Sequence, residues 1–433
     1  MQHNPLITII ADGWNREIFL DYLEKGFLPE ISTDLMQDSI LYKNVITVFP
    51  SVSLASHTSI LTGTSQKDHK ILCHRWFNKS SGIKNYVGID TIRINEDISD
   101  SVQTIFEKTS HNHKYAIQSI ISRGANKKDK YLSFSSSKII KKATKFICKN
   151  PDSNSIIWLP NCDALSHKYG PHSIQVKEEM ITVSKAIGVM IRKLKERNLF
   201  EDSKILFTSD HGFKEVSHRF NLKKLFKDST YKVKINSKKF VEGVNIYTNG
   251  DSIALLYFNI PFKNDELIFK HALKMVESDG IDFIIQKLSG NNFKFISSKG
   301  VSALEVKSNK FASYKLETGE DPLQLLQPGN KEEIINYSEI NPNTLDSKYP
   351  DLINQFLNSF LPESNIDLII TSKSKYHFGV APRFGYRFGY HRGSHGGPSS
   401  DEMLFPAIIH SKNKKGISDF PIRSNSLLNI LLN

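Results

Sequence analysis

The sequence predicts an α/β protein, in which helices flank a mostly parallel central sheet and a smaller α+β subdomain is inserted. Up to about residue 220, short apolar runs rich in β-branched residues alternate with amphipathic stretches, as in parallel strands covered on both faces by helices. Beyond that point, short runs alternate apolar with polar residues, which is typical of an antiparallel sheet. We therefore expect a core of residues 1–220 and 361–433, and an insert of residues 221–360.

Each predicted element rests on a short stretch of sequence. The runs that predict parallel strands are LITII before Asp12, YAIQSII (115–121), SIIWLP (155–160) and KILFTS (204–209). Residues 135–153 and 174–200 have helical spacing of apolar or basic residues, and DELIFKHALKMVESDG predicts a helix within the insert. The later run NIDLIITSK (365–373) again has the texture of a buried strand, so we expect it to return to the central sheet.

The composition is that of an ordinary globular protein. The chain has 433 residues, of which 39% are hydrophobic and 24% charged. It contains no stretch of about 18 or more uncharged apolar residues, which predicts no membrane span. The N-terminal run lacks the basic leader of a signal peptide, so we expect a cytoplasmic location. Three scattered cysteines without a CxxC spacing disfavour disulfides and thiolate metal sites.

The formal net charge of +12 allows two interpretations. Lysine and arginine can steer an anionic substrate or a nucleic acid toward a site, or they can simply form a solvated surface. The lysines of residues 135–153 fit an exposed helix face. Because basic residues without interleaved aromatic residues are a weak signal for nucleic acid, we favour the solvated surface and do not expect a nucleic-acid partner.

Acidic and histidine side chains follow the predicted strands where each strand ends. Asp12 follows the first run, Asp163 and then His167 follow the third, and Asp210 and His211 follow the fourth. Ligands of parallel sheets bind at the carboxyl ends of the strands, so these side chains should meet at one edge. A single aspartate there would be a turn or cap residue. Three, with two histidines, are better explained as ligands of Zn²⁺ or a similar cation.

A candidate hydroxyl lies in VFPSVSLASHTSILTG (48–63). The pattern predicts a helix that starts after Pro50 and stops at Gly63, with Ser53 at or beside its N-cap. An isolated serine at that position would only cap the helix. Beside metal ions, the helix N-terminus would also bind a phosphate, and Ser53 would be a nucleophile.

The last candidate lies in HRGSHGGPSSDEMLFPAII (391–409). Here a Gly-rich loop that holds His395 enters an apolar strand interrupted by proline. Alone, the histidine would be an ordinary loop residue. His391 is a competitor four residues earlier.

In this order, the motifs resemble the alkaline phosphatase superfamily, and most closely its type I phosphodiesterase/nucleotide pyrophosphatase branch. The motifs are Asp12, FPSVSLASHTSILTG, DALSHKYGPHS, SDHGF and GSHGG. The resemblance covers about 1–220 and 365–410, and more loosely the insert, where GEDPLQL (319–325) is similar to bacterial members. It implies an alkaline phosphatase-like core with two divalent cations about 4 Å apart, usually zinc, with Mn²⁺ as the alternative.

The resemblance also implies a role for each motif residue. The implied ligands are Asp163, His167 and His395 for one cation, and Asp12, Ser53, Asp210 and His211 for the other. Ser53, rather than Ser51, would attack phosphorus to give a phospho-enzyme, which a water activated on the Asp163 metal would release. His57 would be structural or would support the ligands from behind.

Three positions depart from the pattern of this branch. Ser53 stands where the nucleotide pyrophosphatases have threonine, although serine is used elsewhere in the superfamily. Leu54 follows it, where nucleotide-cleaving relatives have an aromatic residue that stacks on the base. His74 replaces an asparagine that bonds a phosphate oxygen; it could donate the same bond, and Arg75 could clamp two oxygens. We therefore expect Leu54, His74 and Arg75 to line the phosphate, with a dianionic monoester as an alternative substrate.

The sequence thus predicts a metal-dependent phosphodiesterase or nucleotide pyrophosphatase that acts on a small anionic phosphate ester or diester. A phosphomonoesterase with the same two-metal site is the alternative, and a basic binding protein with a vestigial site is a third. All presumed ligands are present, which disfavours the third. The segment SVSLAS lacks the C/S-x-P-x-R context of sulfatases, and the insert differs from the large domain of phosphoglycerate mutases.

Overall fold

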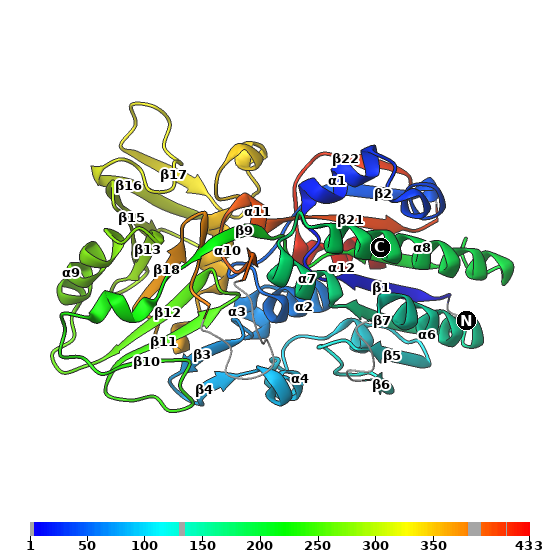
Figure 1. Ribbon diagram of the computed structural model, residues 1–433, viewed down its shortest axis with the longest axis horizontal. Coiled ribbons are helices and arrows are strands. Elements are labelled where there is room, and N and C mark those ends of the chain that lie inside the picture. Colours follow the sequence, from blue (N-terminus) through cyan, green and yellow to red (C-terminus); the bar gives the residue numbers. More distant parts are fainter. Residues whose placement is uncertain (1–3, 130–134, 380–390, 413) are drawn as a thin grey trace.

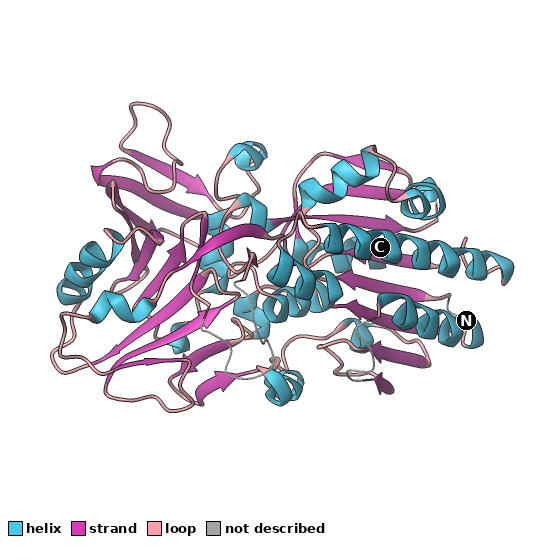
Figure 2. Ribbon diagram, viewed as in Figure 1, coloured by secondary structure: helices cyan, strands magenta, loops and turns pink. Residues whose placement is uncertain are grey.

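The computed structural model describes residues 4–129, 135–379, 391–412 and 414–433. Its strands form two large sheets, which occupy the right and left halves of Figure 1. Each large sheet has nine strands within these residues. Most helices gather around the first sheet (Figure 2), which we call the central sheet.

The central sheet is mostly parallel, as the sequence predicts. Its order is β22-β2-β21-β8-β1-β7-β5-β6, with β23 beside β2. Among the described strands of this sheet, only β21 is antiparallel to its neighbours, β2 and β8. Its strands are β1 (Leu6–Ala11), β2 (Ser39–Ile46), β5 (His113–Ile117), β6 (Lys127–Asp129), β7 (Ser153–Leu159), β8 (Lys204–Thr208), β21 (Leu404–His410), β22 (Gly416–Ser418) and β23 (Ile422–Arg423). The four predicted parallel strands are thus confirmed as β1, β5, β7 and β8.

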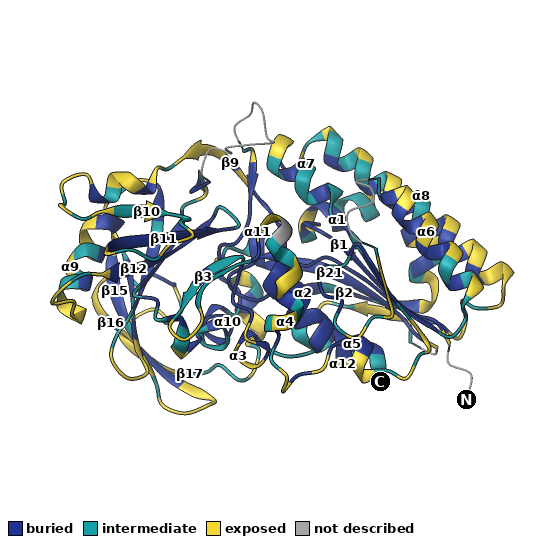
Figure 3. Ribbon diagram, turned by 90° about the horizontal axis from the view of Figure 1, so that it is seen from below, coloured by how far each residue is buried: buried dark blue, intermediate teal, exposed yellow. Residues whose placement is uncertain are grey.

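Helices cover both faces of the central sheet because its strands are apolar on both faces. In β1, Ile7 and Ile9 pack with the apolar sides of α6 and α8, whereas Leu6 and Ile10 pack on the side of α2 and α12. The helices α6 and α8 lie side by side (Figure 1) and expose their outer faces (Figure 3). The helices are α1 (Arg16–Glu24), α2 (Ser53–Thr62), α3 (Gln66–His69), α4 (Ile94–Asp97), α5 (Ile105–Lys108), α6 (Ser136–Lys149), α7 (Asn161–Tyr169), α8 (Ile174–Glu196), α9 (Asp265–Val276), α10 (Leu352–Ser359), α11 (Ser400–Met403) and α12 (Leu427–Leu432).

The second sheet is antiparallel except for the pair β10 and β11, and α9 packs on it at β13 and β14. This confirms the predicted texture of the insert. Its order is β10-β11-β12-β18-β13-β14-β15-β16-β17. The strands are β10 (Val233–Ile235), β11 (Gly243–Asn249), β12 (Ile253–Asn259), β13 (Ile281–Lys287), β14 (Asn292–Ser297), β15 (Gly300–Val306), β16 (Phe311–Gly319), β17 (Glu332–Asn336) and β18 (Leu368–Ser372).

The prediction that residues 365–373 return to the central sheet is wrong. The strand β18 lies between β12 and β13 in the second sheet and is antiparallel to both. Ile369 points into the core shared with the central sheet, and Leu368 and Ile370 point into the core under α9. A strand buried on both faces is apolar throughout in either kind of sheet, so the sequence pattern does not show which sheet this strand joins. The second sheet therefore extends past residue 360.

Two small sheets and a shared core connect the large sheets. One small sheet has the order β19-β9-β20, and the other is the hairpin of β3 and β4. One hydrophobic core runs from α2 and α12 into the second sheet, where it includes Leu255 and Phe283. The small strands are β3 (Arg75–Asn78), β4 (Gly82–Asn85), β9 (Lys214–Arg219), β19 (Lys375–His377) and β20 (Gly393–Ser394). Within the described ranges, no helix is both long and apolar enough to cross a membrane.

Candidate metal centre

Three neighbouring strands bring the predicted ligands to one edge of the central sheet. Asp12 follows β1 directly, and Asp210 and His211 follow β8. Asp163 and His167 lie on α7, which begins after β7. Because β7 and β8 flank β1 and run parallel to it, their carboxyl ends meet at this edge.

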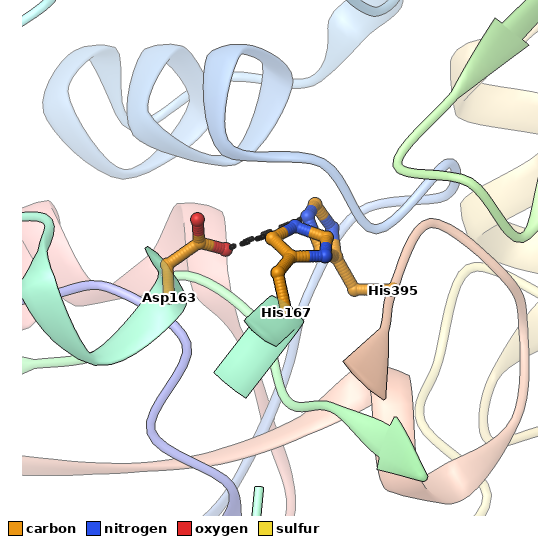
Figure 4. A group of neighbouring side chains, drawn as sticks. All are labelled: Asp163, His167 and His395. Atoms are coloured by element: carbon orange, nitrogen blue, oxygen red, sulfur yellow. Dashed lines mark ion pairs between the residues drawn. The ribbon is translucent and has the colours of Figure 1, made fainter. Parts of the chain in front are cut away.

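The first group of ligand atoms joins α7 to the Gly-rich loop before α11. His167 Nε2 and His395 Nε2 each lie 3.6 Å from Asp163 Oδ1, and Figure 4 shows both imidazoles beside that carboxylate. Asp163 and His167 share a helix face because they are four residues apart. We call Asp163, His167 and His395 the first triad.

Ser51 fixes the loop that carries His395. Its carbonyl oxygen lies 2.9 Å from His395 Nδ1, and its hydroxyl oxygen accepts a bond of 3.0 Å from the N–H of Gly396. Ser51 therefore positions the loop, whereas Ser53 lies at the site itself.

The second group is formed by Asp12, Asp210 and His211, which we call the second triad. His211 Nε2 lies 3.5 Å from Asp12 Oδ1 and 3.4 Å from Asp210 Oδ2. All three side chains are almost completely buried. The other oxygen of Asp210 accepts the N–H groups of Gly13 and His211, both at 3.1 Å, so the backbone orients this carboxylate.

In each triad histidine, the ring nitrogen Nδ1 is hydrogen-bonded to a backbone carbonyl oxygen. The Nδ1 atoms of His167, His211 and His395 lie 3.1, 3.0 and 2.9 Å from the carbonyl oxygens of Gly393, Gly212 and Ser51. A carbonyl can only accept, so each Nδ1 carries the proton and each Nε2 presents its lone pair to the triad. Metal-binding histidines in proteins are oriented in this way.

The separations between ligand atoms fit a cation held between them. Two atoms that bind one tetrahedral Zn²⁺ at roughly 2.1 Å stand roughly 3.4 Å apart. The four distances between histidine and aspartate atoms of the triads are 3.4–3.6 Å, and all ligand atoms of a triad lie within 4.8 Å of one another. Within the part of the chain that the structure describes, Asp12 Oδ1 and Asp163 Oδ1 are buried without a hydrogen-bond partner. The donor set therefore fits two divalent cations, and metal binding itself stays a prediction.

The electrostatics of the buried carboxyl groups also favour a cation. Burial raises the pKa of Asp12, and the negative charges of Asp210 and Asp163 raise it further. Burial raises the pKa of Asp163 to about 7. Burial opposes ionisation of Asp210 too, but His211, His57 and the N–H of Gly13 lower its pKa below the ordinary value. Divalent cations would remove the repulsion between these carboxylates.

The histidines are in the form that a metal requires. Burial lowers the pKa of His167 to about 4. Burial and the neighbouring imidazoles of His211 and His167 also lower the pKa of His395 well below its ordinary value. Both rings are therefore neutral at neutral pH, with a free lone pair.

Ser53 lies next to the second triad. It is the first residue of α2, and its Oγ lies 3.2 Å from His211 Nε2. The helix ends as predicted at Gly63, whose φ of 70° is left-handed, a conformation that glycine adopts without strain. The ten buried residues of α2 thus aim its N-terminus and Ser53 at the edge of the sheet.

Residues 6–278 match the family model of type I phosphodiesterase / nucleotide pyrophosphatase. The chain belongs to this family. Curated relatives include an uncharacterized pyrophosphatase/phosphodiesterase of Schizosaccharomyces pombe, which is 25% identical over 242 residues and covers 49% of this chain and 46% of that protein. The bis(5'-adenosyl)-triphosphatase enpp4 of Xenopus laevis is 23% identical over 222 residues, with coverages of 49% and 48%. The matches thus span about half the length of these relatives.

Solved structures extend the similarity of fold over nearly the whole chain. Murine ectonucleotide pyrophosphatase / phosphodiesterase 5 superposes with a TM-score of 0.63 at 14% identity and covers 98% of this chain and 93% of its own. Phosphonoacetate hydrolase from Sinorhizobium meliloti gives a TM-score of 0.59 at 13% identity, with coverages of 100% and 95%. At 14% and 13% identity, the similarity shows that this chain shares the fold of these two proteins.

Apart from Ser53 itself, this chain departs from the family pattern at Leu54 and His74, which, like the neighbouring Arg75, lie beside Ser53 or close to the triads. His74 and Arg75 are half-buried at the start of β3. Burial and the charges of Arg75 and His211 lower the pKa of His74 to about 3, so it is neutral and can donate one N–H. Leu54 is only 2% exposed and packs in the shared core. A contact of any of these three with phosphate stays a prediction.

Sequence reasoning did not find every residue at the centre. Trp158 donates from Nε1 to Asp12 Oδ2 at 2.7 Å, and Asp251 lies beside His167 and His391. Trp158 is the apolar-strand residue paired with Ile10 of β1, and Asp251 occupies a hairpin turn where aspartate is common. His57 Nε2 lies 3.2 Å from Asp210 Oδ2, which agrees with its expected supporting place.

Proposed function

We propose that this protein hydrolyses phosphodiester or pyrophosphate bonds, with Ser53 as nucleophile and two divalent cations, zinc or manganese. The observation that carries this proposal is the distance of 3.2 Å between Ser53 Oγ and His211 Nε2, which sets a hydroxyl at the edge of the second triad. The first triad would hold one cation, and the second triad with Ser53 would hold the other. Bound there, the cations would lower the pKa values of the hydroxyl and the attacking water.

Ser53 carries the covalent step. Its Oγ forms a bond to phosphorus while the bond from phosphorus to the leaving oxygen breaks, and the hydroxyl proton ends on the leaving group, which departs as an alcohol or phosphate. Water then forms a bond to phosphorus as the bond between Oγ and phosphorus breaks. The phosphoryl group is released as a phosphate monoester or phosphate, and a proton from the water restores the serine hydroxyl. The free N–H groups in the first turn of α2 bind phosphoryl oxygens during both steps.

The substrate class follows from the same residues. Family names among the relatives include pyrophosphatases and a bis(5'-adenosyl)-triphosphatase, which supports a diester or pyrophosphate. Leu54 has no aromatic ring on which a base could stack, so we do not propose that this site recognises a base. A small anionic ester is the substrate that we expect.

A phosphomonoesterase is the second candidate, and His74 and Arg75 are the observation that favours it. A monoester carries one more negative charge than a diester. A guanidinium can clamp two phosphate oxygens at once, and a neutral His74 adds one donor. Both side chains can therefore bind a dianionic phosphate more strongly than a monoanionic one.

The test compares a nitrophenyl phosphate monoester with a bis-nitrophenyl phosphodiester in Zn²⁺ or Mn²⁺, for wild type, Ser53→Ala and Ser53→Thr. We expect metal-dependent cleavage of the diester that falls roughly 10³-fold or more in Ser53→Ala, because the nucleophile is lost. Ser53→Thr keeps a hydroxyl and should retain much of the activity.

Each result has a defined meaning. A clear monoester preference would move the assignment to the second candidate. Equal rates for wild type and Ser53→Ala would rule out the serine mechanism. Purified protein that retains little zinc in chelator-free buffer would support the third option, a binding protein with a vestigial site.

A further inference from the structure

Trp158 and Asp12 come from neighbouring strands and meet on one face of the central sheet. Trp158 of β7 pairs with Ile10 of β1, and both side chains pack in the core on the side of α2. Asp12 follows Ile10 by two residues, so its side chain leaves the backbone on the same side. Trp158 Nε1 therefore reaches Asp12 and donates to its Oδ2 at 2.7 Å.

This bond makes the two oxygens of Asp12 unequal. Oδ2 accepts from the indole N–H. Oδ1 is buried without a hydrogen-bond partner within the described residues, and it lies 3.5 Å from His211 Nε2. Because Asp12 is only 1% exposed, water has little access to either oxygen. Trp158 thus occupies one oxygen and leaves the other for a cation.

The backbone divides the carboxylate of Asp210 in the same way. Its Oδ1 accepts the N–H groups of Gly13 and His211, both at 3.1 Å, whereas its Oδ2 lies 3.4 Å from His211 Nε2. The second site then offers one donor atom from each of four residues, namely Asp12 Oδ1, Asp210 Oδ2, His211 Nε2 and Ser53 Oγ. Four donors suit tetrahedral Zn²⁺, whereas Mn²⁺ prefers an octahedral set of oxygen ligands.

We propose that Trp158 is a positioning residue that restricts Asp12 to a single ligand oxygen and thereby favours zinc over manganese at the second triad. This inference rests on the two cations of the proposed function, and it adds a residue that determines which cation binds. Without the indole N–H, both oxygens of Asp12 become available, which adds a fifth donor atom. A carboxylate that offers two oxygens suits ions of higher coordination number.

The indole ring is itself held in place. The strand β7 lies inside the central sheet, between β1 and β5. The ring of Trp158 packs edge to face against the ring of His57, with centroids 5.7 Å apart and an angle of 88°. His57 is fully buried on α2. The indole N–H is therefore directed at Asp12 before any cation binds.

The alternative is that Trp158 only fills space. Trp158→Phe removes the N–H, whereas Trp158→His keeps one, because imidazole Nε2 can take the same place relative to Cβ as indole Nε1. Competition titration with a zinc-binding dye measures the affinity of the weaker site. We expect this affinity to fall about 10–100-fold in Trp158→Phe, and Trp158→His to recover most of the loss. Space filling predicts the opposite order, since histidine is smaller than phenylalanine.

The choice of metal distinguishes positioning from a general loosening of the site. In Trp158→Phe we expect the affinity for Mn²⁺ to fall less than that for Zn²⁺, because Asp12 then offers both oxygens. Bound Co²⁺ should also absorb visible light more weakly in Trp158→Phe than in wild type, since four-coordinate Co²⁺ absorbs more strongly than six-coordinate Co²⁺. A loosened site would instead lose affinity for zinc and manganese equally.

Trp76→Phe is the matched control for loss of an indole. Trp76 is 1% exposed, and its Nε1 has no hydrogen-bond partner in the part of the chain that the structure describes. Its substitution should leave both metal affinities unchanged. Thermal melts of the metal-free proteins check that each variant folds.

Equal zinc affinities in wild type and Trp158→Phe would overturn the proposal, and so would equal losses for zinc and manganese. A crystal of the wild-type protein with zinc gives a result that does not depend on a variant. Trp158 Nε1 should remain bonded to Asp12 Oδ2, with zinc on Oδ1. Zinc held by both oxygens of Asp12 would overturn the proposal.

These measurements do not depend on turnover. A protein that shows the expected effects of Trp158→Phe but cleaves neither nitrophenyl substrate would contradict the proposed function and support the role of Trp158. An active protein whose zinc affinity does not respond to Trp158→Phe would support the proposed function and contradict that role. Wild type that binds no zinc would overturn both.

Discussion

Arg75 is the side chain on which we expect the choice between monoester and diester to depend most. Its Nε donates to Asn85 Oδ1 at 3.1 Å, and its backbone N–H donates to Asn249 Oδ1 at 2.8 Å. These bonds fix the backbone of Arg75 and the Nε side of its guanidinium, and we propose that its two Nη groups bind a phosphate.

For Arg75→Gln we expect kcat/KM for a monoester to fall about tenfold, and that for a diester to fall less. Loss of a hydrogen bond to a charged group is worth about 1.5–3 kcal/mol, and the dianion gains more from the guanidinium. Steady-state kinetics with both nitrophenyl esters measure the ratio. The exposed Arg93→Gln controls for loss of positive charge, and an equal fall with both esters would contradict the expectation.

His69, which lies outside the metal centre, makes the free energy of unfolding depend on pH. It is fully buried, with Nδ1 accepting from the N–H of Ile71 and Nε2 facing Ser59 Oγ at 2.9 Å. Burial lowers the pKa of His69 to about 3. The unfolded chain takes up a proton below about pH 6.5 and the native protein does not, so this residue reduces stability as the pH falls from 6.5 toward 3.

We expect metal-free wild type to lose more stability between pH 7 and pH 5 than His69→Gln does. The difference should approach about 1.4 kcal/mol for each pH unit below 6.5. Urea unfolding at both pH values, in the presence of a chelator, provides the free energies. The exposed His113→Gln is the control for loss of an imidazole, and identical slopes in wild type and His69→Gln would refute the assignment.

At single positions, sequence reasoning succeeded where residue type and strand end coincided. Asp12, Asp163 and Asp210 each follow an apolar strand, so topology alone brings them together. Asp251 lacks such a signal, because an aspartate after Asn-Gly in a hairpin has an ordinary structural explanation. Only the folded chain sets it beside His391.

At the scale of elements, a buried ion pair holds the segment that carries His395. Lys214 of β9 is 3.5 Å from Glu402 of α11, and the side chains are 5% and 1% exposed. Glu402 also accepts from the N–H of Gly397 and the hydroxyl of Ser399 at 2.9 and 2.6 Å. The carboxylate thus ties the Gly-rich loop to β9 and to α11.

For Glu402→Gln we expect the free energy of unfolding to fall by roughly 3 kcal/mol, because Lys214 keeps a buried charge without its partner. Zinc affinity of the first triad should fall about tenfold as the loop loosens. Denaturant unfolding and zinc titration measure the two effects. The exposed pair of Lys299 and Glu320 supplies the control Glu320→Gln, for which we expect a change below about 1 kcal/mol.

Helices and strands could be predicted where the hydrophobic period and the length of the segment were clear. The sheet to which a strand belongs could not be predicted where the strand is buried on both faces. The alternation of the insert strands and the helix α9 follow from the pattern. The run that forms β18 does not reveal its sheet, because a strand covered on both faces has no polar side to identify its neighbours. Its pairing is decided by contacts far apart in the sequence.

At the scale of the whole molecule, bound cations would join distant segments of the chain. A cation in the first triad would join His395 to α7, and one in the second triad would join Asp12 to the segment after β8, and the rings of His211 and His395 from the two triads stack at 3.9 Å. A ligand that binds only the native state stabilises it by about 4 kcal/mol at a thousandfold excess over its Kd. Metal should therefore raise the unfolding temperature substantially.

We expect a chelator to lower the unfolding temperature of the purified protein and added Zn²⁺ to restore it. Differential scanning calorimetry measures the shift. A double variant, Asp12→Asn with Asp163→Asn, should show no response to zinc. An unchanged unfolding temperature for wild type after chelation would count against metal binding by the triads.

The position of β18 and β21 also has a consequence for how the chain is made. Each is a late segment that lies inside its sheet, β18 between β12 and β13 and β21 between β2 and β8. A chain still on the ribosome before residue 368 lacks the strand that joins the two halves of the second sheet, and before residue 404 the same holds for the central sheet. Both sheets therefore close only once residues 368–372 and 404–410 have been made, and termination before these residues leaves exposed strand edges that chaperones and proteases recognise.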